Sequence, residues 1–359
     1  MTERFNDNGP RAKERNDLRI LKLPKKDLRK FLDSISKFGE LWGPVKKGER
    51  YVFERTDPDN LDLEGKRTIL PLKKFFIPPK FRMFKYDKNG YTEDLQNIPN
   101  RVVIGVHSCD LAGFTILNKL FTERYPDPYW IERRKRTAII GVSCMPDEFC
   151  FCNETGTDSV DEGFDLFLSE TGADFYLVWI GSSLGDDLMR MAEPLFSEDI
   201  SPEDMQKFID WKKARQKEFK LDIDLMAMPS INELSTSSKI WDKIGERCLA
   251  CGSCSMVCPT CNCYDVRDTV ELKECAGDRN RCWDSCTLHE YSLVAGGHNF
   301  RASKADRMRL WYTHKLEAFI GAFGKPSCVG CGRCLVTCPV DINVYTVSKT
   351  LRGEGGYFK

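Results

Sequence analysis

Two short stretches, CLACGSCSMVCPTC (248–261) and CVGCGRCLVTCP (328–339), carry nearly the same cysteine pattern. Each contains one C-x2-C-x2-C-x3-C-P run. Three thiolates at this spacing on a tightly looping backbone can surround a 4Fe–4S cube, and the proline then turns the chain away. The repeat therefore predicts a ferredoxin-like domain that binds two 4Fe–4S clusters.

The fourth ligand of each cube is expected to come from the other run, as in two-cluster ferredoxins. This crossing requires residues 264–327, which we call the intervening segment, to fold as an excursion between the runs. Glycines inside the runs would let backbone amides approach the sulfurs. The predicted ligands are Cys248, Cys251, Cys254 and Cys338 for the first cube, and Cys328, Cys331, Cys334 and Cys258 for the second.

Structural zinc is the alternative for these cysteines. Zinc ribbons use two C-x2-C pairs for each ion, and a run of four cysteines that occurs twice is not that pattern. The chain has 17 cysteines, and its first residues contain no apolar run typical of a signal peptide. Metal binding is therefore favoured over a disulfide scaffold.

Four further cysteines occur near the ends of two predicted strands. RVVIGVHSC (101–109) and RTAIIGVSC (136–144) are apolar and β-branched, and the segment between them has helical spacing. Such a βαβ unit makes the strands parallel, so that Cys109 and Cys144 reach the same sheet edge. Together with Cys150 and Cys152 they could hold a third metal centre, of iron–sulfur or zinc type, although packing as small buried residues is the simpler alternative.

The remaining cysteines and the histidines give no comparable signal. Within or beside the intervening segment the cysteines show no C-x2-C spacing among themselves, which favours packing over ligation. The four histidines are scattered through the chain. No nucleotide loop, catalytic triad or catalytic carboxylate pair is recognisable. The five cysteines concerned are Cys261, Cys263, Cys275, Cys282 and Cys286.

The domain organisation follows from these signals. Strand and helix patterns predict an α/β domain over residues 18–192, and a helical connector is expected over 193–236, with Ser201 as a helix N-cap. A mainly α-helical, ferredoxin-like dicluster domain is expected over 237–359, with few strands and a strong helix over 305–323. Residues 1–17 are polar and predicted to be a disordered arm.

Composition restricts the classes of partner and the location. The 54 basic and 54 acidic residues leave no net charge, so no field would gather nucleic acid or an anionic membrane. No apolar stretch is long enough to span a bilayer. We expect a cytoplasmic protein with no membrane span.

Most of the chain, about residues 60–345, resembles the β subunits of cytoplasmic sulfhydrogenases and the A subunits of anaerobic sulfite reductases. The ferredoxin runs alone would be unspecific, whereas the WDSC and GGHNFR stretches, in that order between the two runs, are much more specific. The resemblance rests on FFIPPK (75–80), GVHSCDLAGFTILNKLF (105–121), CFCNETGTD (150–158), CLACGSCSMVCPTCNCYDV (248–266), WDSCTLHEYSLVAGGHNFR (283–301) and KPSCVGCGRCLVTCPVDI (325–342).

This resemblance implies an electron-relay subunit. Its partners would be a flavoprotein subunit linked to NAD(P)H or ferredoxin and a catalytic subunit of hydrogenase, sulfite reductase or heterodisulfide reductase type. The eight cysteines of the two runs match the family's cluster ligands, while Cys109, Cys144, Cys150 and Cys152 fall in matching stretches. The alternative is a free-standing iron–sulfur reductase with a substrate or flavin site in the α/β domain.

The intervening segment is expected to contact another subunit, because aromatic residues mixed with arginine are enriched at interfaces. The alternative is that the aromatics cover the clusters and the basic side chains are solvated. The residues in question are Trp283, Tyr291, Phe300, Trp311 and Tyr312 with Arg301, Lys304, Arg307 and Arg309.

Overall fold

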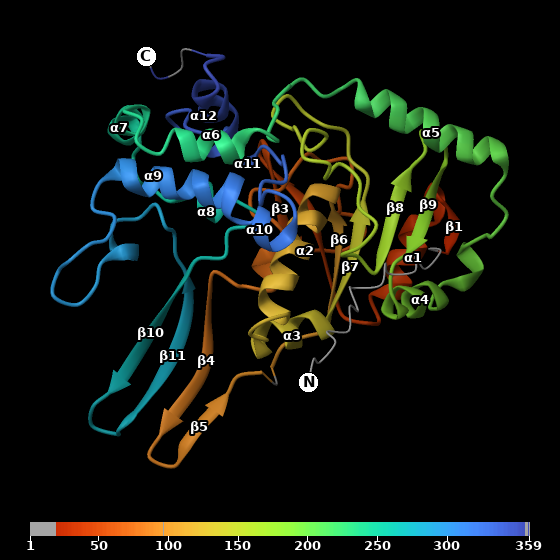
Figure 1. Ribbon diagram of the computed structural model, residues 1–359. Helices are drawn as coiled ribbons and strands as arrows, with labels where there is room; N and C mark the ends of the chain where they lie inside the picture. The colour runs from red at the N-terminus through yellow and green to blue at the C-terminus, as the bar shows by residue number, and fades with distance from the viewer. Residues whose placement is uncertain (1–18, 96, 356–357, 359) are drawn as a thin grey trace, which may run out of the picture.

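A seven-stranded mixed sheet forms the centre of the N-terminal half (Figure 1). The computed structural model describes residues 19–95, 97–355 and 358, so the predicted disordered arm over 1–17 lies outside the described residues. The four central strands are parallel and both edges are antiparallel. In order across the sheet the strands are β1 (Ile20–Pro24), β9 (Phe175–Ile180), β8 (Leu166–Glu170), β7 (Thr137–Val142), β6 (Arg101–Val106), β2 (Glu40–Lys47) and β3 (Arg50–Arg55).

The predicted βαβ unit is confirmed as β6, α2 (Ser108–Thr122) and β7, with the two strands parallel. Alternate residues of the strands enter two separate cores, as the period of two requires: Val102 and Ile104 face one core, and Val103 and Val106 face the other. The helices α2 and α3 (Pro128–Lys135) cover one face, and α1 (Leu28–Ile35) and α4 (Ser183–Arg190) cover the other (Figure 1).

A second, four-stranded antiparallel sheet joins the two halves of the chain. Its order is β10 (Tyr264–Glu271), β11 (Ala276–Trp283), β4 (Lys80–Asp87) and β5 (Gly90–Glu93). The two hairpins project from the body as a pair of arms (Figure 1). The β10–β11 hairpin departs from the expectation of few strands after the first cysteine run.

The connector is helical, as predicted. Helix α5 (Pro202–Gln216) begins with a capping box, in which the Ser201 hydroxyl accepts from the Asp204 amide and the Asp204 carboxylate accepts from the Ser201 amide. Near its C-terminal end, Arg215 Nε donates to the carbonyl of Cys144 at 2.7 Å. Helix α5 thereby covers the carboxyl ends of the parallel strands. Helix α6 (Met228–Leu234) follows.

Short helices make up most of the C-terminal part, and their core surrounds the buried Trp241, Met308 and Tyr312. The helix expected over 305–323 is interrupted by a π-helical stretch, His314–Ala318. The α-helices are α7 (Ile240–Arg247), α8 (Ser253–Met256), α9 (Lys304–Thr313), α10 (Ile320–Phe323), α11 (Arg333–Thr337) and α12 (Val344–Leu351). Short 3₁₀ helices lie at Lys25–Asp27, Leu72–Phe75, Glu193–Leu195 and Glu290–Ser292. The boundaries proposed between the domains stay a prediction, and both halves contribute strands to the second sheet.

Candidate metal centres

The first predicted ligand set surrounds one small cavity. Cys248 follows the last residue of α7, Cys254 lies in α8, and Cys251 is in the turn between them. Cys338, which directly follows α11, lines the same cavity although it comes from the other run. The amide of Ala250 donates to Cys248 Sγ at 3.3 Å, and the amide of Ile342 donates to Cys338 Sγ at 3.2 Å. The fold thus brings together the four sulfurs that the crossing arrangement requires.

The second predicted set surrounds a neighbouring cavity. Cys328, Cys331 and Cys334 line it together with Cys258, which comes from the first run. Cys254 also borders this cavity, so the two sites share a wall. Cys258 therefore lies at the second cavity and Cys338 at the first, while the role of these cysteines as cluster ligands stays a prediction.

The two runs repeat one backbone conformation. In the first run Ala250 and Gly252 have positive φ angles of 53° and 75°, and in the second Gly330 and Gly332 have φ angles of 60° and 72°. Gly252 is the N-cap of α8, and Gly332 is the N-cap of α11. Each of these short helices carries the third cysteine of its run. Left-handed residues at these places wrap the loop around the cavity and direct amides inward, a concave arrangement that favours anions such as thiolates.

Without a metal, most of these buried thiols would resist ionisation. Burial, reinforced by Cys248 and Cys338, raises the pKa of Cys254 to about 12. Burial, reinforced by Cys331 and Cys258, raises the pKa of Cys328 to about 12. Metal-bound thiols are deprotonated by the charge of the metal itself. Four converging cysteines at each cavity, most of them neutral without a metal, are a donor set that fits an iron–sulfur cube.

Buried lysines lie against this region. Lys315 Nζ donates to Cys258 Sγ at 3.1 Å and to Thr260 Oγ1 at 2.6 Å. Lys73 Nζ donates to the carbonyls of Ser255 and Cys261, each at 3.0 Å, and lies over the Trp283 ring. Hydrogen bonding to Cys261, aided by Lys315 and Lys73, holds the pKa of Cys258 well below its usual range. The second site is therefore the more positively charged of the two.

The four cysteines predicted at the strand ends also lie near one another. Cys109 and Cys152 are buried, while Cys144 and Cys150 are partly buried. Burial raises the pKa of Cys150 to about 12. Cys144 differs, because His107 and Arg215 outweigh the effect of burial and lower its pKa to about 7. Arg67 Nη2 donates to Cys150 Sγ at 3.4 Å.

This third group packs against the second run. Cys109, Cys152, Val329 and Cys331 belong to one apolar cluster. The amide of Phe151 donates to the carbonyl of Gly330 at 2.9 Å, which fixes the loop that carries Cys152 beside the second site. Two hydrogen bonds of 2.5 and 2.7 Å join Arg333 on α11 to Asp110 at the start of α2. The third group and the second site therefore share one continuous packed region.

Three of the other cysteines lie next to a further cysteine. Cys263 and Cys286 are hydrogen-bonded, and this contact lowers the pKa of Cys263 to about 6. Cys261 is hydrogen-bonded to Cys258. By contrast, Cys275 is exposed at the turn between β10 and β11, and Cys282 lies within β11. Cys261, Cys263 and Cys286 line a small cavity together with Lys315. Lys315 also lines the second site, so these three cysteines belong to its surroundings.

The aromatic and basic side chains of the intervening segment divide into two groups. Trp311 and Tyr312 are buried inside the chain, and buried Arg307 donates to the carbonyls of Thr287, Arg301 and Ala302. For these three the prediction of contact with another subunit is wrong, because the chain itself encloses them. Phe300 is 70% exposed and Tyr291 is 38% exposed, so these two remain accessible.

Sequence reasoning missed the cations near the sulfurs. Four cations come from segments distant in the sequence from the cysteine that each approaches: Lys73, Lys315, Arg67 and Arg215. The only sequence signal for such a buried cation is a basic residue placed within an apolar helical pattern, as Lys315 is between Trp311 and Phe319.

Among the described residues, no group of three or more His, Cys, Asp or Glu side chains is arranged to hold a single metal ion. Each sulfur of a cubane site binds a different iron, so its four thiols lie further apart than the ligands of one zinc ion. Within the same residues, no helix is long and apolar enough to cross a membrane.

Comparison with known proteins agrees with the geometry. Residues 247–342 match the family described as a 4Fe-4S dicluster domain, which confirms that part of the cofactor prediction. The chain is 42% identical over 337 residues to sulfhydrogenase 2 subunit beta of Pyrococcus furiosus. This alignment covers 93% of the chain and 99% of that relative. With its dicluster domain and this similarity along nearly its whole length, the chain belongs to the sulfhydrogenase beta subunit family.

Proposed function

We propose that this chain relays low-potential electrons between a flavoprotein subunit, linked to NAD(P)H or ferredoxin, and a catalytic subunit. The observation that carries the proposal is the pair of adjoining four-cysteine cavities, each completed by a cysteine from the other run. Bound 4Fe–4S clusters exchange single electrons at potentials set by their surroundings. Two such sites that share a wall are suited to passing electrons from one to the other.

The proposed ligands are those expected from the spacing. Cys248, Cys251, Cys254 and Cys338 would hold the first cluster, and the four cysteines lining the second cavity would hold the other. Amides donating to Cys248 and Cys338, and Lys315 donating to Cys258, support the sulfurs in the way that known iron–sulfur sites are supported.

A third centre is proposed at Cys109, Cys144, Cys150 and Cys152. Two observations support it: Cys109 and Cys152 pack in one apolar cluster, and Arg67 donates to Cys150 Sγ while Arg215 donates to the Cys144 carbonyl. The group packs against the second run, so a cluster here would extend the relay into the α/β half. An iron–sulfur cluster suits this group better than zinc, because none of the described groups is arranged to hold a single metal ion.

The catalytic partner is proposed to be of hydrogenase type, since the relative is named as a sulfhydrogenase subunit. Sulfite reductase and heterodisulfide reductase types remain as the further possibilities that the resemblance implied. For the contact surface we propose the exposed part of the intervening segment. Phe300 and Tyr291 lie there, and the β10–β11 arm adds Val270 and Leu272, which are 55% and 86% exposed.

The second candidate function is a free-standing reductase. It is favoured by one observation, a cavity of about 180 Å³ in the α/β half whose wall includes Cys144. A reductase of this kind would bind and turn over its substrate without partner subunits, whereas a relay would not.

The experiment is anaerobic purification of the native protein from its source, followed by size-exclusion chromatography and metal analysis. We expect elution within a hetero-oligomer, with about eight irons per chain for two cubes or about twelve if the third centre is also a cube. Stoichiometric zinc with little iron would contradict the cluster assignment. A lone 41.2 kDa monomer with full activity toward a physiological substrate would overturn the relay.

A further inference from the structure

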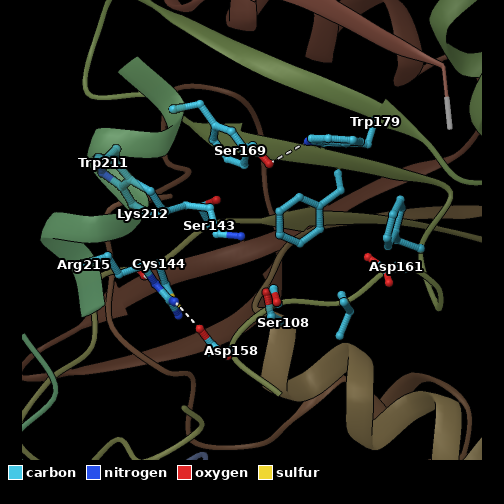
Figure 2. A pocket seen from close by; sticks show the side chains of 15 residues that line it. Ser108, Ser143, Cys144, Asp158, Asp161, Ser169, Trp179, Trp211, Lys212 and Arg215 are labelled. Carbon is cyan, nitrogen blue, oxygen red and sulfur yellow. Dashed lines mark hydrogen bonds and ion pairs between the residues drawn. The ribbon is translucent and has the colours of Figure 1, made fainter. Parts of the chain in front are cut away.

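A cavity of about 180 Å³ lies at the carboxyl ends of β7 and β8, between these strands and α5 (Figure 2). Open α/β sheets place their ligands at this edge. The cavity is not one of the two cysteine-lined sites of the C-terminal part, although Cys144 forms a portion of its wall. Its shape and lining therefore call for their own explanation.

Aromatic side chains supply most of the apolar wall: Phe164, Phe167, Trp179, Phe208 and Trp211. Trp179 is held in place by a 2.8 Å hydrogen bond from its Nε1 to Ser169 Oγ, which Figure 2 shows at the top of the cavity. An apolar cavity of about 150 Å³ accommodates benzene. The volume here fits one aromatic ring with a small substituent, and aromatic walls favour a planar guest through stacking and edge contacts.

One side of the cavity favours negative charge. Ser108 is the first residue of the 15-residue helix α2, and Figure 2 shows its hydroxyl directed into the cavity. Ser108 is only 4% exposed, and its hydroxyl has no hydrogen-bond partner among the described residues. A helix N-terminus presents free amides and a partial positive charge to an anion. The acid in the first turn, Asp110, does not cancel this charge, because Arg333 pairs with it.

Helix α5 adds two cations on the same side (Figure 2). Arg215 is buried and pairs with Asp158 at 3.1 Å. Its charge is therefore already neutralised, and its main contribution is to hold the wall in place. Lys212 lines the cavity and forms no ion pair with any described carboxylate; its ammonium lies over the Phe208 ring. Asp161, the other acid of the wall, lies on the opposite side in Figure 2.

We propose that this cavity binds a small planar anion, a single aromatic or heteroaromatic ring that carries a carboxylate or a comparable acidic group. The ring occupies the aromatic walls, and the acidic group accepts from Ser108 and faces Lys212. This site goes beyond the relay proposed above and does not rest on it, because none of the residues that recognise the anion is a proposed cluster ligand.

The test is calorimetric titration of the full-length, anaerobically prepared chain with benzoate. Benzyl alcohol and acetate serve as matched probes, since one lacks the charge and the other lacks the ring. We expect benzoate to bind more tightly than either. Equal binding of benzyl alcohol and benzoate, or no benzoate binding, would overturn the proposal.

Variants locate the binding within the cavity. Ser108→Ala removes one hydrogen bond to a charged group and should weaken benzoate about tenfold, and it should weaken benzyl alcohol less, because the hydroxyl of that probe is uncharged. Lys212→Ala should weaken benzoate, whereas Lys213→Ala, the exposed neighbour that does not line the cavity, should not. Asp161→Asn should tighten benzoate binding, because it removes a negative charge from the wall of the cavity. Benzoate binding that is indifferent to Ser108→Ala and Lys212→Ala would place the anion elsewhere and contradict the assignment.

Discussion

Cys258 occupies the point at which the two cysteine runs meet. It belongs by sequence to the first run, but it lines the cavity of the second, and it accepts a hydrogen bond from Lys315. Cys338 has the reciprocal position in the first cavity. The pair therefore distinguishes a crossed arrangement from one in which each run holds its own cube.

Replacing Cys258 by alanine should remove the cluster associated with residues 328–334 and leave the other cluster intact. The variant should lose about half of the iron of a two-cube protein. Electron paramagnetic resonance of the reduced protein would show which signal disappears. Cys338→Ala is the matched control and should remove the other signal. If Cys258→Ala instead abolishes the signal of the 248–254 site, the runs do not cross.

Replacing Lys315 by methionine should lower the reduction potential of the second cluster. The buried ammonium donates to Cys258 Sγ, and a nearby positive charge favours the more negative, reduced state. A redox titration monitored by paramagnetic resonance measures the shift. Lys304→Met is the control, since Lys304 Nζ donates to the Cys248 carbonyl at 2.7 Å and to no sulfur. A potential of the second cluster that stays unchanged in Lys315→Met would contradict this electrostatic role.

At this scale the sequence indicated which cysteines line each cavity, but it did not indicate the cations around them. Spacing within a run is a local property, so the cysteines that line each cavity could be expected. Lys73 comes from a segment nearly two hundred residues away from its acceptors, Ser255 and Cys261. Only tertiary packing brings Lys73 to these acceptors, so no pattern in its own segment of the sequence could predict the contact.

Among the elements, the loop that carries Cys150 and Cys152 packs closely on the second run. A Cβ at Gly330 would lie 2.4 Å from the carbonyl oxygen of Phe151 and 2.5 Å from Cys152 Cα. Gly330 also has a φ of 60°, a conformation that costs a residue with a side chain about 1–2 kcal/mol. The close approach of the two backbones thus depends on this glycine.

Gly330→Ala should destabilise the protein more than Gly48→Ala. Gly48 has the same φ of 60°, but nothing lies within 4 Å of a Cβ placed there. The two variants share the conformational cost, and the difference between them reports the clash, about 1–3 kcal/mol. Anaerobic chemical denaturation of both variants measures it. An equal loss of unfolding free energy in the two variants would contradict this expectation. It would show that the backbones at Gly330 and at Phe151–Cys152 can move apart at little energetic cost.

Elements with a buried face were predictable, and those without one were not. Strands β6 and β7 are apolar after their first residue, and helix α5 begins with a clear cap, so these elements were expected correctly. The β10–β11 hairpin is rich in charge; strand β10 is mostly exposed, and β11 lacks the apolar alternation of a half-buried strand. Its partner β4 lies far away in the sequence.

Viewed as a whole, the molecule connects an α/β half to a dicluster half through three kinds of contact. The second sheet takes strands from both, the third cysteine group packs on the second run, and Arg333 pairs with Asp110 across the boundary. Composition and patterning predicted the two halves, while the way they adjoin required the structure. Their close packing gives the proposed relay a path from the α/β half to the dicluster sites.

The relay is tested most directly by following the iron–sulfur signals of this chain by paramagnetic resonance, first alone and then in its anaerobically isolated complex. NAD(P)H or reduced ferredoxin is added as the donor. We predict that the signals of the reduced clusters appear only in the complex and decline when the catalytic subunit receives its substrate. A chain that is reduced in the absence of any partner, and then converts a physiological substrate at full rate, would contradict the account.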